Sequence, residues 1–188
     1  MEENKNTNII KYLKLLMYLH IASLILGLID FLPLVHSLSV WVNRGISVGV
    51  IYCLYSLSPV AERYRKSAIF HAIVLIAGLV ANPMIALAGS VCSILASWQE
   101  YHGHSELVEP YHQRLSKQWG KLFALELMAG IFMALITTLM TVVLTMTNGN
   151  QAVDISSTAL MGIIMSVGYI VEVLYIFYMK HTVELLEA

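Results

Sequence analysis

The stretch SAIFHAIVLIAGLVANPMIALAGSVCSILASW, residues 67–98, decides how many times this chain folds back on itself. As one α-helix, these 32 residues would be about 48 Å long at 1.5 Å per residue. A bilayer core of about 30 Å needs only about 20 helical residues. The pair Asn82-Pro83 lies at the centre of the stretch, and the residue before a proline is biased out of the helical region. The stretch is therefore either one long kinked helix or a tight hairpin of two helices.

The positions of the basic residues favour the hairpin, because Lys and Arg collect on the cytoplasmic side of short loops. With a single crossing, Lys180 and the basic residues at 114–121 would lie outside the cell. With a hairpin, ten of the 11 basic residues lie inside, and Arg44 falls within a helix. The ten are Lys5, Lys11, Lys14, Arg63, Arg65, Lys66, Arg114, Lys117, Lys121 and Lys180.

The composition places the chain in a membrane. Of its 188 residues, 58% are apolar and 12% are charged, against roughly 45–50% and about 25% in soluble domains. The mean hydropathy is +0.72. These values exclude a disordered chain, a nucleic-acid binder and an ordinary soluble enzyme. They predict a single integral membrane domain over residues 1–188, with the lipid bilayer as its partner and no nucleic acid.

Five apolar stretches are visible, at 9–32, 34–58, 67–98, 119–147 and 155–179. With 67–98 divided in two, the prediction is an all-α polytopic bundle of six transmembrane helices arranged as three hairpins. The outer turns are expected near Pro33, at Asn82-Pro83 and at 148–150. Both termini and segment 98–121 are expected in the cytoplasm, with the protein in the plasma (inner) membrane. The first apolar stretch is too long for a signal peptide and is expected to remain in the protein as its first helix.

Small residues mark expected helix contacts, since helices in lipid approach closely only where side chains are small. Ala86, Ser90, Ser93 and Ser97 recur at spacings of 4, 3 and 4 on one predicted helix, and Gly45 and Gly49 form a GxxxG pair. Such contacts pack helices within one chain, or join it to a second copy or to another membrane protein. Cys53 and Cys92 lie in apolar runs and are expected to behave as small hydrophobes.

Ionisable residues within the predicted helices are the candidate functional residues, because burying them in lipid is costly. Residue counting places Asp30 and Arg44 towards the outer surface, His20 near the middle, and Glu126, Glu172 and His71 towards the inner surface. One hypothesis is a polar file that crosses the membrane through these groups. In the alternative, Arg44 pairs with Asp30 as a structural ion pair, and the two glutamates are structural. Glu126 and Glu172 are expected at similar depth and could share one site. The predicted file consists of His20, Asp30, Arg44, His71, Glu126 and Glu172.

Cofactor signals are weak, and the sequence names no cofactor. His20 and His71 differ by roughly 8–10 Å in the depth estimated by residue counting, which disfavours one haem iron between them. His102, His104 and His112 are zinc-capable in kind but match no standard spacing. Segment 98–112 therefore reads as a hydrated cytoplasmic elbow. The sequence also lacks a Gly-x-Ser-x-Gly elbow, a His-Glu-x-x-His motif and a phosphate-binding glycine loop.

Three hypotheses for function follow. The favoured one is a solute or ion pathway, channel-like or carrier-like, lined by the buried ionisable residues. The second is a membrane-embedded partner or regulatory subunit that does not transport. An intramembrane enzyme is less favoured than either. In length and helix number the chain resembles the substrate-binding subunits of vitamin uptake systems, and the resemblance includes no motif, so it assigns no residues.

Overall fold

The computed structural model describes residues 2–29, 36–146 and 151–188, with side chains over 6–29, 38–142, 146 and 166–188. All regular secondary structure in these ranges is helical, which confirms the all-α prediction with six helices. The helices are α1 (Glu2–Ile29), α2 (His36–Leu57), α3 (Glu62–Ala77), α4 (Pro83–Val108), α5 (Gln113–Met146) and α6 (Gln151–Glu187). The turns expected near Pro33 and at 148–150 lie outside the described residues.

The stretch 67–98 is a hairpin of two helices, and local chemistry explains the break. Asn82 has extended backbone angles, and its Oδ1 accepts hydrogen bonds from the N–H groups of Met84 (2.9 Å) and Ile85 (3.3 Å). Pro83 takes the first helical position, where the missing N–H costs nothing. Asn82 and Pro83 therefore start α4 instead of kinking a longer helix.

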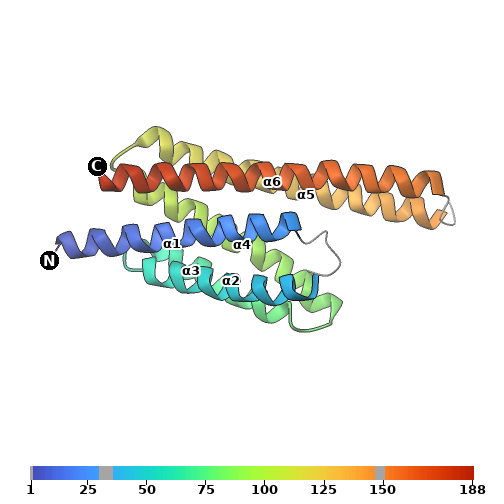
Figure 1. Ribbon diagram of the computed structural model, residues 1–188, viewed down its shortest axis with the longest axis horizontal. Helices are drawn as coiled ribbons and strands as arrows, with labels where there is room; N and C mark the ends of the chain where they lie inside the picture. Colours follow the sequence, from blue (N-terminus) through green and yellow to red (C-terminus); the bar gives the residue numbers. More distant parts are fainter. Residues whose placement is uncertain (1, 30–35, 147–150) are drawn as a thin grey trace.

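The six helices form a closed ring. Each helix packs on the next one along the chain, and α6 packs on α1. Both chain termini lie at the same end of the bundle, together with the α2–α3 and α4–α5 connections (Figure 1). This end is referred to below as the terminal end. The ring places residues that are far apart in sequence around one shared interior.

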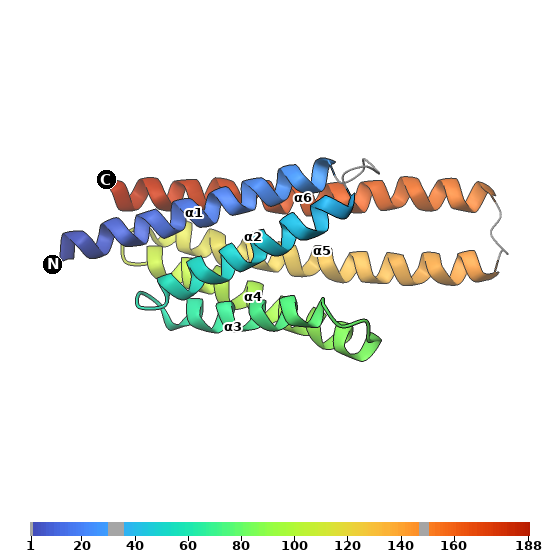
Figure 2. The same ribbon diagram turned by 60° about the horizontal axis from the view of Figure 1, so that its bottom comes forward.

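The densest packing lies towards the terminal end. Leu13, Leu54, Tyr64, Trp119 and Met179 are completely buried there, on five of the six helices. At the opposite end, α5 and α6 extend past the other four helices (Figure 2). The tightly packed half provides the rigid frame on which the site described below is built.

Three helices of the described chain are long and apolar enough to cross a membrane, over Asn6–Ile29, Leu38–Leu57 and Gln113–Val142. Most of their residues are not buried within the chain. Large apolar side chains such as Ile25, Phe132 and Leu135 are more than half exposed. An apolar surface of this extent is typical of a protein that contacts lipid or a partner.

Candidate functional site

A cluster of ionisable and aromatic side chains occupies the interior of the ring around the carboxylate of Glu100, which is only 3% exposed. His71 Nε2 lies 3.1 Å from Glu100 Oε2 and donates to it. Tyr175 donates its hydroxyl proton to Glu100 Oε1. His20 Nε2 lies 3.7 Å from the same oxygen. The cluster, called the Glu100 cluster below, comprises His20 of α1, His71 of α3, Glu100 and His104 of α4, and Glu172 and Tyr175 of α6.

Hydrogen bonds within the cluster have a defined direction. Because Tyr175 donates its only proton to Glu100, its oxygen must accept the proton of His104 Nε2, 3.1 Å away. His104 Nδ1 then carries the lone pair, and Tyr64 donates its hydroxyl proton to it across 2.8 Å. Three successive donors, Tyr64, His104 and Tyr175, therefore point towards the Glu100 carboxylate and stabilise its negative charge.

Burial is consistent with this tautomer. His104 is completely buried and lies on the part of α4 that follows the apolar stretch ending at Trp98. Removal from water lowers the pKa of His104 from its ordinary value of 6.5, although the neighbouring Glu100 opposes this effect. His104 is therefore a neutral imidazole that transmits a hydrogen bond between two tyrosines.

His20 lies between two carboxylates. Its Nδ1 donates to Glu172 Oε1 across 2.7 Å. Among the described residues, its Nε2 has no hydrogen-bond partner and faces Glu100 at 3.7 Å. A lone pair pointing at a carboxylate would be repelled, whereas an N–H would be attracted. The geometry therefore favours an imidazolium at His20, bridging Glu172 and Glu100.

A cavity of about 300 Å³ borders the cluster. Its polar wall contains three carboxylates, and its other wall is small or apolar. A Cβ atom added to Gly130 or Gly168 would meet no atom within 4 Å, so these glycines leave space open. A second cavity of about 260 Å³ shares Ser97, Glu126 and Gly130 with it. The first cavity is lined by His20, His71, Ser97, Glu100, Tyr101, Glu126, Ala129, Gly130, Met133, Gly168, Val171, Glu172 and Tyr175.

Four of the six residues predicted for the polar file line this cavity, namely His20, His71, Glu126 and Glu172. Arg44 does not line it, since its guanidinium lies over the ring of Trp41, 4.8 Å from the centroid. Asp30 lies outside the described residues, and so does any pairing of it with Arg44. His20, His71, Glu126 and Glu172 thus gather at one place, and Arg44 lies apart from them.

The depths estimated for His20 and His71 did not reveal that their side chains meet at one carboxylate. Both residues reach the same carboxylate, although residue counting separated them by roughly 8–10 Å. Counting treats all helices as parallel and perpendicular to the membrane, and it ignores tilt between them. Figure 2 shows α1 and α2 inclined to α5 and α6.

Of the small residues predicted for helix packing, some lie at close contacts between helices and others do not. A Cβ on Gly49 would come within 3.0 Å of Leu19, so Gly49 packs α2 against α1, whereas Gly45 has no such neighbour. On α4, the closest approach is made by the buried Gly89, where a Cβ would lie 3.0 Å from Ala77 of α3. The exposed residues Ala86, Ser90 and Ser93 line a pocket between α3 and α4 beside this contact. Ser97 lines the cavity beside the Glu100 cluster.

The three zinc-capable histidines point to different neighbours. His102 Nδ1 contacts the carbonyl oxygen of Trp98, His104 belongs to the Glu100 cluster, and His112 Nδ1 accepts from the Leu115 N–H. Within the described ranges, no group of three or more His, Cys, Asp or Glu residues could hold a metal ion.

The structure also corrects the interpretation of segment 98–112 as a hydrated elbow. Its first half is the C-terminal part of α4, and Glu100, Tyr101 and His104 are buried there. Glu100 is the centre of the site and was not predicted as a site residue. The available signal was spacing, because Ser97, Glu100, Tyr101 and His104 share one helical face.

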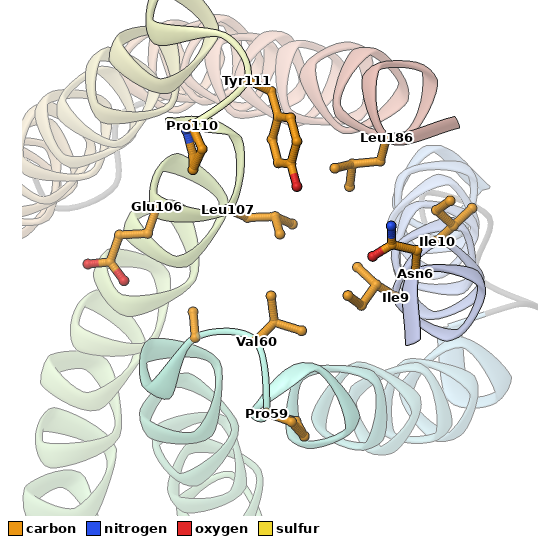
Figure 3. Close-up of a pocket in the computed structure, with 11 residues that line it drawn as sticks. Asn6, Ile9, Ile10, Pro59, Val60, Glu106, Leu107, Pro110, Tyr111 and Leu186 are labelled. Atoms are coloured by element: carbon orange, nitrogen blue, oxygen red, sulfur yellow. The ribbon is translucent and has the colours of Figure 1, made fainter. Parts of the chain in front are cut away.

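A separate cavity of about 580 Å³ opens at the terminal end. Ile9 of α1, Val60 between α2 and α3, Leu107 of α4 and Leu186 of α6 surround it, with Tyr111 at its edge (Figure 3). It lies beside the helix ends and is not part of the Glu100 cluster.

Comparison with protein-family models, curated proteins and solved structures finds no match to this chain. The functional argument therefore rests on the site itself.

Proposed function

We propose that the protein is an integral membrane protein that forms a pathway for a small solute or ion, with the cavity beside the Glu100 cluster as its binding site. The observation that carries this proposal is the meeting of ionisable side chains from α1, α3, α4, α5 and α6 at one cavity of about 300 Å³. A cavity of this size is at the lower end of the range for small-molecule sites.

Burial supports a functional role more than a structural one. A helix bundle gains little stability from buried charges, because their desolvation offsets most of their attraction. Glu126 and Glu172 are partly buried on the cavity wall, on helices that expose many of their described apolar side chains. Ionisable groups in such positions mark ion and substrate pathways.

The proposed membrane arrangement keeps all six helices as spans, with the terminal end in the cytoplasm. Both termini and the α4–α5 connection lie at one end, where the basic residues of the sequence also concentrate. The positive-inside rule then assigns that end to the cytoplasm.

The proposal is tested by electrical recording from proteoliposomes on a solid-supported membrane. Exchange of buffers containing single ions or small charged solutes is expected to produce currents with the unmodified protein. Glu172→Gln removes the partly exposed carboxylate, and Gly168→Leu fills the open space beside it; both should abolish the currents. Gly45→Leu is the matched control, because its side chain would also enter open space but Gly45 does not line the cavity. Currents that survive both cavity variants would exclude this pathway.

A second candidate function is a non-transporting subunit that binds a partner in the cytoplasm. The cavity at the terminal end favours it, since Ile9, Val60 and Leu107 offer an apolar surface there. Complementation of a deletion strain separates the two candidates. Val60→Lys should lose function if a partner binds at the terminal end, whereas Gly168→Leu should lose function if the pathway is used.

A further inference from the structure

From the charges that line the cavity, we infer that the solute is a small organic cation, with an ammonium-type group held by Glu172 and Glu126 and an alkyl part against the apolar wall. This inference rests on the proposed function and specifies the class of its substrate. It uses the cavity beside the Glu100 cluster and no other part of the molecule.

The balance of charged groups excludes an anion as the preferred solute. Three carboxylates line the cavity, from Glu100, Glu126 and Glu172, against the imidazoles of His20 and His71. Among the described residues that line it, none is Lys or Arg. An anionic solute would therefore meet only the His20 imidazolium, which already bridges Glu172 and Glu100, and it would lie beside carboxylates in a region of low dielectric constant.

The three carboxylates are not equally free to bind a ligand. The side chain of Glu100 is only 4% exposed, and it accepts hydrogen bonds from Tyr175 and His71. Glu172 has a side chain that is 30% exposed, and one of its oxygens accepts from His20. Glu126 is partly buried on the facing helix α5. Glu172 therefore retains acceptor capacity towards the cavity, and Glu126 lines the cavity from α5 beside Ser97 and Tyr101. Glu100 lies behind them and accepts from His71 and Tyr175.

The remaining wall suits an alkyl group. Ala129 and Met133 of α5 and Val171 of α6 are apolar, and Gly130 and Gly168 leave the space between the helices open. The rings of Tyr101 and Tyr175 also line the cavity. Aromatic faces attract a desolvated cation, which gives an amine a further advantage over a neutral molecule of the same shape.

The test uses three probes of the same chain length and different charge, namely n-butylammonium, 1-butanol and butyrate. Isothermal titration calorimetry on the full chain in lipid nanodiscs is expected to show binding of n-butylammonium alone. Glu172→Gln and Glu126→Gln should each weaken it by about tenfold or more, since hydrogen bonds to charged groups contribute that much. Glu184→Gln is the control on α6, because Glu184 is exposed and pairs with Lys180; it should bind as the unmodified protein does.

The outcomes separate the inference from the proposed function. Binding of butyrate or 1-butanol in preference to n-butylammonium overturns the inference, and so does the absence of binding by all three probes. If currents in the proteoliposome assay still depend on Glu172 and Gly168 in those cases, the proposed pathway stands without its cationic substrate. Binding of n-butylammonium that is lost in Gly168→Leu and retained in Gly45→Leu supports the inference, even where no current is recorded and the pathway itself fails.

Discussion

His20 Nδ1 lies 2.7 Å from Glu172 Oε1, although 152 positions separate the two residues in the sequence. This contact joins α1 to α6, which are neighbours in the ring, on the side that faces its interior. A second contact between the same helices, Lys14 Nζ to Glu187 Oε1 at 2.5 Å, lies at the surface, with both side chains more than 40% exposed. The two pairs offer a comparison between a partly buried and an exposed connection.

The first prediction concerns these two pairs. His20→Leu and Glu172→Leu should each lower the free energy of unfolding by about 1–3 kcal/mol, because each leaves a charged partner without its hydrogen bond. The double variant should lose less than the sum of the two, by about 1 kcal/mol or more. Glu187→Gln should cost at most about 1 kcal/mol. Unfolding titrations with SDS measure all four, and additive losses for His20 and Glu172 would contradict the contact.

The second prediction concerns the close approach of Gly103 to Tyr64. A Cβ on Gly103 would lie 3.0 Å from Tyr64 Cε1, so Gly103→Ala should displace the ring and weaken its bond to His104. We expect a loss of about 1–3 kcal/mol from overpacking. The matched control is Gly120→Ala, where a Cβ meets no atom within 4 Å. That change should stabilise its helix by up to about 1 kcal/mol.

Thermal melts of the two alanine variants distinguish the effects of helix propensity and packing. Propensity alone predicts that both variants become more stable, whereas the structure predicts opposite signs. Equal shifts in the same direction would show that Tyr64 does not lie against Gly103.

The third prediction concerns pH. In the unfolded chain His104 takes up a proton near pH 6.5, whereas burial lowers the pKa of His104 in the folded protein. The unfolded state therefore binds more protons as the pH falls below about 6.5, and the folded state loses stability on acidification. The contribution of the neutral His104 side chain to the free energy of unfolding is fully present above that pH.

The measurement compares the melting temperature at pH 8 and pH 5 with that of His104→Gln. The glutamine amide can accept from Tyr64 and donate to Tyr175 without titrating. The unmodified protein should lose more stability on acidification than the variant does. Every other ionisable group is present in both proteins, so its contribution is removed by the comparison. An equal loss in both would show that His104 is not held neutral.

The fourth prediction concerns topology. Glu109 is exposed in the connection between α4 and α5, and Asn150 lies between α5 and α6 in the sequence. In a background of Cys53→Ala and Cys92→Ala, a membrane-impermeant maleimide applied to intact cells should label Asn150→Cys and spare Glu109→Cys. Labelling of Glu109→Cys from outside would contradict a cytoplasmic terminal end.

The fifth prediction concerns the start of α4. Asn82→Ala removes the acceptor of the Met84 and Ile85 N–H groups and should cost about 0.5–2 kcal/mol. Asn82→Asp retains an acceptor oxygen and should restore most of that stability. Thermal melts of the two variants make the comparison.

The division of the chain into six helices could be predicted because its signals are local. Asn82 and Pro83 specify a break through their own backbone chemistry, and apolar stretches of helical length show the remaining elements. The site could be predicted only in part. His20, His71, Glu126 and Glu172 stand out as charges within apolar runs, so their burial could be inferred from neighbouring residues alone.

Glu100 was missed, and His104 was considered only as a weak zinc candidate, because their neighbours are polar. In Trp98-Gln99-Glu100-Tyr101-His102 a charged residue looks hydrated, and its burial depends on α1, α3 and α6, which are distant in sequence. Residue counting also failed to bring His20 and His71 together, because the tilt of one helix against another results from side-chain packing around the whole ring. For Arg44 the error is in the other direction. It was predicted as a pathway residue because it is a charge within a predicted span, but its guanidinium lies over Trp41 and it does not line the cavity.

In the proposed arrangement of six spans, the short length of α3 has a consequence for the surrounding lipid. With 16 residues, this helix is about 24 Å long, less than the bilayer core of about 30 Å. A span that is too short is accommodated by local thinning of the bilayer. Such hydrophobic mismatch would draw headgroups and water towards His71, whose side chain is 28% exposed on this helix. On this side of the ring, the thinned membrane itself would shorten the route from water to the buried carboxylates.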